Sequence, residues 1–277
     1  MTVSTRADGA AAPDLDVLVP TFGRPAALPV VLAGLASQVG APPFRVVVSS
    51  QDDDARWPGE VLSMVGILRG RGIPVELVRH LPRRGIAEHR DALLARVDAP
   101  FALFLDDDVW LEPDTLARMV AVLLAEGCGF VGSAPIGWSF LGDVRPEEQV
   151  LEPWTGPVEP EPVVPDGPGW ERHRLHNAAN MVHAARAMGL GPGQTLLYRV
   201  AWVGGCVLYD TAALRDVGGF GFWQDLPPHH VGEDAVAELR VMRRRGGCGI
   251  LPSGAWHLEL PTTIPVRDVD APRALPL

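Results

Sequence analysis

A short apolar run that ends in three consecutive aspartates constrains this chain more than any other stretch. Residues 101–110 read FALFLDDDVW, a run too short for a helix and closed by charge, which predicts a buried parallel strand over residues 101–105. Such strands deliver polar side chains to the carboxyl edge of an open α/β sheet, where ligands bind. Three crowded carboxylates repel one another, and a divalent cation held with phosphate oxygens would supply the missing positive charge. The alternative is an acidic turn, which aspartate favours through its backbone hydrogen bonds.

The composition indicates a globular α/β protein without a basic binding surface. A length of 277 residues suits one large α/β domain with an elaborated second half, and 47% hydrophobic residues can build a sizeable core. The net charge of -10 argues against nucleic-acid partners and anionic lipid surfaces. No apolar run has the length of a membrane span, and the first residues lack a signal-peptide pattern. We therefore expect a cytoplasmic protein without an integral membrane segment.

The chain contains no lysine. This absence excludes a Walker-type phosphate loop, a pyridoxal Schiff base and a lysine nucleophile. Arginine must therefore provide the cationic contacts to any anionic ligand. The three cysteines are scattered without metal-ligand spacing, which favours reduced, buried side chains.

Strands and helices alternate through the first half of the chain. Apolar runs predict strands over residues 15–20, 44–50, 74–78, 101–105 and 129–134, and helical spacing predicts helices from Leu28 and over 61–68, 86–97 and 115–125. This order predicts βαβ units and a mainly parallel twisted sheet with helices on both faces.

The second half has a different pattern. Residues 145–169 are rich in proline, glycine and acid, which predicts an irregular loop or lid with little to pack. We then expect a helix over 170–188, a strand over 201–210, a helix over 232–247 and a short strand from Cys248.

Polar residues at the predicted strand ends are candidates for binding an anionic ligand. Arg24 lies in the turn PTFGRP after the first strand, and residues 49–54, SSQDDD, end the second. Arg83, Arg84 and Arg90 flank the start of the helix over 86–97, where the helix dipole and the guanidinium groups both favour a diphosphate. The alternatives are ordinary turn chemistry and solvated charge.

The order of the motifs resembles family 2 glycosyltransferases of the GT-A fold. PTFGR follows the first strand, RGIAEHRDALL precedes LFLDDDVWLEPDTL, and VGG, VGGF and GEDAVAELRVMRRRG come later, with a histidine soon after. The resemblance covers about residues 15–260. It implies a Rossmann-like α/β fold, an inverting, hexosyltransferase-like enzyme of class EC 2.4, a UDP- or GDP-linked sugar donor, a hydroxyl acceptor, and Mg²⁺ or Mn²⁺ as cofactor.

By this resemblance the chain divides into two functional halves. Residues 15–135 would bind the nucleotide sugar, and residues 136–260 would bind the acceptor and carry the catalytic acid, with the proline-rich lid at 145–169. A disordered tail over 1–14 and a C-terminal tail over 261–277 flank them.

The resemblance also implies roles for single residues. Asp106 and Asp108 match the Asp-x-Asp element, with Asp108 on the metal and Asp106 on the ribose or a metal-bound water. Asp234 matches the acid proposed as general base, with Glu233 beside it, and His257 matches a histidine that joins the metal and diphosphate in some members. Asp234 lies at a predicted helix N-terminus, so we expect it to stay ionised at neutral pH.

The other matches form the expected donor and acceptor sites. The donor-binding residues are Pro20, Thr21, Arg24, Ser49, Asp52, Arg84, Arg90, Asp106 and Asp107. The acceptor-binding residues are Trp202, Gly204, Gly205 and His230. Two departures leave the nucleobase open: Ser49 stands where the family has an acid, with Asp52–Asp54 as substitutes, and Asp91 stands where it has asparagine.

Three other functions remain as alternatives. A haloacid-dehalogenase-type phosphatase also ends a strand in Asp-x-Asp, but it requires Thr or Val at the position of Trp110, and a lysine. A sugar-1-phosphate nucleotidyltransferase has a glycine-rich loop that PTFGRP does not match. A sugar-nucleotide-binding protein without turnover would not need the Gly-Glu-Asp sequence at residues 232–234.

Overall fold

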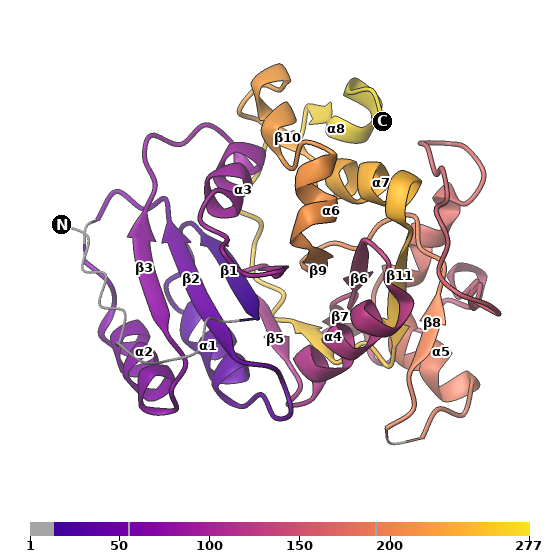
Figure 1. Ribbon diagram of the computed structural model, residues 1–277, viewed down its shortest axis with the longest axis horizontal. Helices are drawn as coiled ribbons and strands as arrows, with labels where there is room; N and C mark the ends of the chain where they lie inside the picture. The colour runs from indigo at the N-terminus through magenta and orange to yellow at the C-terminus, as the bar shows by residue number, and fades with distance from the viewer. Residues whose placement is uncertain (1–13, 55, 192) are drawn as a thin grey trace.

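An eight-stranded sheet forms the centre of the molecule (Figure 1). The computed structural model describes residues 14–54, 56–191 and 193–277. The strand order is β3 (Val75–Arg79), β2 (Phe44–Ser50), β1 (Leu15–Thr21), β4 (Phe101–Leu105), β9 (Cys206–Asp210), β6 (Phe130–Gly132), β11 (Gly247–Leu251) and β8 (Leu196–Tyr198). Only β9 and β8 run against the other strands of this sheet. The mainly parallel sheet is thus confirmed. The predicted tail over 1–14 lies outside the described residues except for Asp14.

Helices cover both faces of the sheet, because successive side chains of a strand point to opposite faces. In β4, Leu103 and Leu105 pack with one apolar cluster, whereas Ala102 and Phe104 pack with the other. The first cluster takes in the helices α1 (Leu28–Ala36), α2 (Gly59–Gly70) and α4 (Thr115–Glu126). The second takes in α3 (Ile86–Leu94), α5 (Asn180–Ala187), α6 (Thr211–Asp216) and α7 (Glu233–Arg245).

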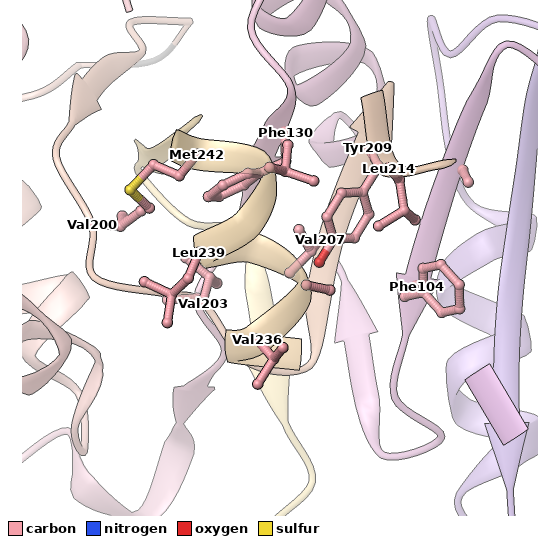
Figure 2. Packing of buried hydrophobic residues seen from close by; sticks show 14 of the residues in the cluster. Phe104, Phe130, Val200, Val203, Val207, Tyr209, Leu214, Val236, Leu239 and Met242 are labelled. Atoms are coloured by element: carbon pink, nitrogen blue, oxygen red, sulfur yellow. The ribbon is translucent and has the colours of Figure 1, made fainter. Parts of the chain in front are cut away.

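The packing of α7 onto the sheet sets the position of its N-terminal acids. Val236, Leu239 and Met242 recur at helical spacing and pack in one buried cluster with Val207 and Tyr209 of β9 (Figure 2). All five side chains are at most 2% exposed. The apolar stripe of α7 therefore fixes the helix and orients its first turn.

Short strands that the sequence analysis did not predict form two small sheets. One sheet joins β5 (Val109–Leu111), β12 (Ala255–His257) and β7 (Ile136–Gly137), and the other joins β10 (His230–Val231) and β13 (Val269–Asp270). In the first sheet, His257 of β12 pairs with Val109 of β5. This pairing brings His257 beside the aspartates that precede β5.

Two predicted elements in the second half are wrong. The expected helix over 170–188 is a 3-10 helix (Trp170–His176) followed by α5, and Ala178 between them has a φ of 52°, which a continuous helix cannot hold. The expected strand over 201–210 begins only at Cys206. Gly205 before it has a φ of +74°, so the chain turns at this position.

The proline-rich segment over 145–169 is better packed than we expected. Val158 and Val163 are buried, and Pro153 forms a β-bridge to Tyr198. The Arg199 guanidinium lies 3.7 Å from the centre of the Trp154 ring. None of the described residues that line the two pockets at the carboxyl edge of the sheet belongs to this segment.

The C-terminal residues are not a free tail. The described part of the chain ends in β13 and α8 (Ala271–Ala274), and α8 packs against α7 near the C-terminus (Figure 1). Upstream, the Pro261 carbonyl accepts a hydrogen bond of 2.8 Å from Arg24 Nη2. Among the described helices, none is both long and apolar enough to cross a lipid bilayer.

Candidate functional site

The three aspartates after β4 lie in a cleft of about 990 Å³ at the carboxyl edge of the sheet, as predicted. The Asp106 N–H donates to the Gly205 carbonyl at 2.8 Å, which ties the end of β4 to the start of β9. Asp107 and Asp108 are buried, whereas Asp106 is partly exposed. The cleft therefore presents one accessible and two enclosed carboxylates.

Residues of the turn after β1 hold Asp107. Thr21 Oγ1 donates to Asp107 Oδ2 at 2.7 Å, and Arg24 Nη1 donates to Asp107 Oδ1 at 3.0 Å. The same Arg24 nitrogen also donates to Asp108 Oδ2. Burial raises the pKa of Asp107 to about 6, although Thr21 and Arg24 act in the opposite direction. Arg24, which we expected to face the nucleotide, thus contacts the carboxylates of Asp107 and Asp108.

Asp108 and His257 form a candidate metal centre. His257 Nε2 lies 3.4 Å from Asp108 Oδ2, and the Leu258 N–H donates to the Asp108 carbonyl at 2.8 Å. Burial raises the pKa of Asp108, and His257 opposes this effect. Within residues 14–54, 56–191 and 193–277 no three histidine, cysteine or acidic side chains group around a possible metal position. One carboxylate and one imidazole fit an ion that completes its shell with diphosphate oxygens and water.

Arg90 connects the aspartates to the first turn of α7. Its Nη2 donates to Asp106 Oδ1 at 2.9 Å, and its Nε lies 2.9 Å from Glu233 Oε1. Burial disfavours the charged guanidinium, but Glu233 and Asp106 outweigh burial and raise the pKa of Arg90. Asp106, expected on the metal or ribose, is therefore oriented by Arg90.

Asp234 lies next to this ion pair and lines the cleft. Burial, followed by the charge of Glu233, raises its pKa to about 7. We expected Asp234 to stay ionised at neutral pH; with this pKa it is ionised only in part, because burial outweighs the helix dipole. A carboxyl group with this pKa suits general base catalysis near neutral pH.

Two glycines before β9 leave space for the carboxylates of Asp234 and Asp106. A Cβ on Gly204 would lie 3.4 Å from Asp234 Oδ2, and a Cβ on Gly205 would lie 3.3 Å from Asp106 Oδ2. Trp202 lines the same cleft, and its indole Nε1 is buried without a hydrogen-bond partner among the described residues. Of these three expected acceptor residues, Gly204 thus lies near Trp202 and Asp234, and Gly205 lies near Asp106.

A second pocket of about 450 Å³ adjoins the cleft and shares Thr21 with it. The Gly23 N–H donates to Asp52 Oδ1 at 2.8 Å, which joins the turns after β1 and β2. The polar and aromatic lining includes Thr21, Ser50, Asp52, Trp57 and Arg79. Asp52 and Ser50, both in the candidate turn over residues 49–54, line this pocket, whereas Trp57 and Arg79 were missed because no recognisable motif marks them.

Three expected site residues lie elsewhere. Ser49 is buried with its Oγ 2.8 Å from His89 Nε2, and Arg84 is exposed outside both pockets, where Arg83 lines the cleft instead. His230 is buried. Its Nδ1 lies 2.7 Å from the Pro227 carbonyl and its Nε2 accepts from the Ala87 N–H at 3.2 Å, so neither ring nitrogen is free for an acceptor.

The C-terminal segment also contributes to the cleft, which the sequence analysis missed. The lining residues from this segment are Leu260, Thr262, Thr263, Ile264, Pro265, Val266, Arg267 and Asp270. The segment has no periodic apolar pattern that would have separated it from a solvated tail.

Comparison with known proteins identifies relatives of this arrangement. A model of glycosyl transferase family 2 matches residues 16–152. No curated protein sequence matches the chain. Residues 1–349 of TarS from S. aureus, in complex with UDP-GlcNAc, superimpose with a TM-score of 0.57 at 16% identity, covering 91% of this chain and 60% of TarS 1–349.

A second solved structure has the same fold. The mannosyltransferase PcManGT from Pyrobaculum calidifontis, in complex with GDP-Man and Mn²⁺, superimposes with a TM-score of 0.53 at 18% identity, covering 86% of this chain and 57% of that one. The chain thus spans about 60% of the length of these structures. At such identities the likeness shows a common GT-A fold.

Proposed function

Because this chain belongs to glycosyl transferase family 2 through residues 16–152, we propose that it transfers a sugar from a nucleoside-diphosphate donor to an acceptor hydroxyl, with inversion at the anomeric carbon. One observation carries the proposal. Arg90 joins Asp106 and Glu233, at 2.9 Å from each. The aspartates, which are suited to a metal-bound diphosphate, and the Asp234 carboxyl, which is suited to a base, therefore share one cleft.

The two adjoining pockets divide the donor between them. The pocket of about 450 Å³ has the size and the aromatic Trp57 to hold a nucleoside, and the larger cleft would hold the diphosphate and sugar. TarS binds UDP-GlcNAc and PcManGT binds GDP-Man. We therefore expect a donor linked to UDP or GDP.

Asp108 and His257 would hold Mg²⁺ or Mn²⁺ together with the donor diphosphate. When bound, the ion stabilises the negative charge that develops on the leaving diphosphate. Arg90 would keep Asp106 oriented toward the diphosphate, and the burial of Asp107 and Asp108 excludes water that would weaken these interactions.

Asp234 acts as the general base in this proposal. It takes the proton from the acceptor hydroxyl while that oxygen forms a bond to the anomeric carbon. The bond from this carbon to the diphosphate oxygen breaks, and its electron pair stays on the diphosphate. Attack from the face opposite the leaving group gives inversion in one displacement. Trp202 Nε1, which has no partner among the described residues, would donate to an acceptor oxygen.

Calorimetric titration of UDP- and GDP-sugars, with and without Mn²⁺, tests this function. We expect one donor class to bind only with the metal, and Asp108→Asn to abolish that dependence. Asp143 is a surface carboxylate paired with Arg145, so the control variant Asp143→Asn should leave donor binding and its metal dependence unchanged. NMR of the product would show whether the anomeric configuration is inverted. Donor binding by Asp108→Asn with unchanged metal dependence would contradict the site assignment.

A further inference from the structure

The guanidinium of Arg24 contacts two of the three aspartates that follow β4. Its Nη1 donates to both Asp107 and Asp108, and its Nη2 donates to the Pro261 carbonyl at 2.8 Å. The Arg24 side chain is 14% exposed. One cation therefore joins the turn after β1, the end of β4 and the C-terminal segment.

We propose that Arg24 is an internal counter-ion that excludes a divalent cation from Asp108 until the donor diphosphate arrives with it. The inference rests on the proposed function, since it concerns the same site. Arg24 Nη1 and a metal ion compete for the same oxygen, Asp108 Oδ2. The bare ion must displace a buried charge-assisted hydrogen bond and leave the guanidinium without that partner.

The diphosphate changes this balance. Its oxygens offer the displaced guanidinium a bidentate partner, which Arg binds in preference to a single point charge. The metal and the diphosphate then favour one another's binding, which is a coupling free energy between two ligands. Arg24 would exchange a carboxylate partner for a phosphate partner, and it would keep its charge compensated throughout.

The same exchange reaches the C-terminal segment. When Arg24 leaves Asp108, its hydrogen bond to the Pro261 carbonyl must break or move with it. Leu260 and residues 262–267 line the cleft. The side-chain hydrogen bonds that connect Thr262, Ile264 and Arg267 lie within this segment and are exposed. Entry of the metal with a diphosphate should therefore alter this segment, whereas the metal alone should not.

Binding of Mn²⁺ alone, measured by electron paramagnetic resonance of the free ion, tests the proposal. Arg24→Gln should bind Mn²⁺ about tenfold or more tightly than the native chain, within the usual range of coupling between sites. Arg24→Lys keeps a cation and should stay near native. Arg84→Gln removes one positive charge from an exposed position outside the cleft, and its affinity for Mn²⁺ should rise little. No gain in Arg24→Gln, or an equal gain in Arg84→Gln, would overturn the proposal.

A measurement on the native chain covers the case in which the Arg24 variants fold poorly. Amide hydrogen exchange over residues 258–268 is followed with Mn²⁺ alone, pyrophosphate alone and both together. We expect a change only with both, and the same change with Mn²⁺ alone would contradict the proposal. If Arg24→Gln binds Mn²⁺ more tightly but no nucleotide sugar binds, the proposed function fails while the role of Arg24 stands. If a nucleotide sugar binds but Arg24→Gln does not bind Mn²⁺ more tightly, the role of Arg24 fails while the proposed function stands.

Discussion

Arg90 and Glu233 form an ion pair of 2.9 Å that joins α3 to α7 in the lining of the cleft. Both side chains are buried, and the guanidinium also reaches Asp106. Arg90 therefore fixes the distance between residues 106–108 and residues 233–234, two acidic segments that lie far apart in the sequence.

Loss of this guanidinium should destabilise the fold strongly. Arg90→Met leaves Glu233 buried without its partner, which costs about 3–5 kcal/mol in the free energy of unfolding. Arg96→Met removes an ion pair of similar length with Glu76, 2.8 Å, but the Arg96 side chain is 44% exposed, so this control should lose less than about 1 kcal/mol. Urea unfolding compares the two variants. Equal losses would show that burial does not set the strength of the Arg90 pair.

The raised pKa of Asp234 predicts the pH dependence of turnover. A general base acts only when deprotonated, so kcat/KM should rise with pH through about 7 and then level off. Glu233, Arg90 and Asp106 act on the same carboxyl, so the apparent value belongs to the group. A pH–rate profile measures this limb. A profile without it would argue against Asp234 as base.

The raised pKa of Asp234 also predicts that the stability of the fold decreases as pH rises, whereas turnover increases. The folded-state pKa of about 7 lies above the unfolded value of 3.8, so burial of Asp234 costs nothing below pH 3.8 and costs progressively more as pH rises to about 7. Asp234→Asn should remove this contribution and flatten the stability profile between these values. An identical profile for the native chain and Asp234→Asn, measured by thermal unfolding, would contradict the raised pKa.

Gly205 and Gly218 form a matched pair for testing the close approach at Asp106. Both have positive φ, 74° and 89°, so alanine strains the backbone at each by roughly 1–2 kcal/mol. A Cβ at Gly205 would lie 3.1 Å from Pro135 Cγ and 3.3 Å from Asp106 Oδ2, whereas a Cβ at Gly218 meets nothing within 4 Å. We expect Gly205→Ala to lose at least as much stability as Gly218→Ala, because its Cβ also meets Pro135, and we expect a loss of donor affinity and turnover only in Gly205→Ala. Calorimetry and a turnover assay decide between these outcomes, and equal activity in both variants would be contrary evidence.

The strands near the site could be predicted because their apolar runs have clear ends. Residues 44–50 and 101–105 match β2 and β4 at both ends, and the aspartates after β4 lie at the sheet edge as expected. These features depend on local sequence alone. The two valines that anchor the proline-rich segment, Val158 and Val163, have no such pattern, so their burial was not predictable.

Contacts between distant segments account for what was missed. The strands β5, β12 and β7 have two or three residues each, too few to show an alternating pattern. The Arg24 bond to the Pro261 carbonyl depends on how the C-terminal segment folds back. The pKa of Asp234 likewise depends on burial, which a helix N-terminus in the sequence does not reveal.

Turnover of Asp234→Asn, measured beside its calorimetric donor affinity, tests the central claim most directly. Asparagine is nearly isosteric, so folding and donor affinity should stay close to native while turnover falls by about two to four orders of magnitude, the usual contribution of a general base. Glu233→Gln should have a milder effect on turnover if Glu233 serves only to orient neighbouring groups. A near-native rate for Asp234→Asn would remove Asp234 as the base, and loss of donor affinity together with turnover would place Asp234 in the donor site instead.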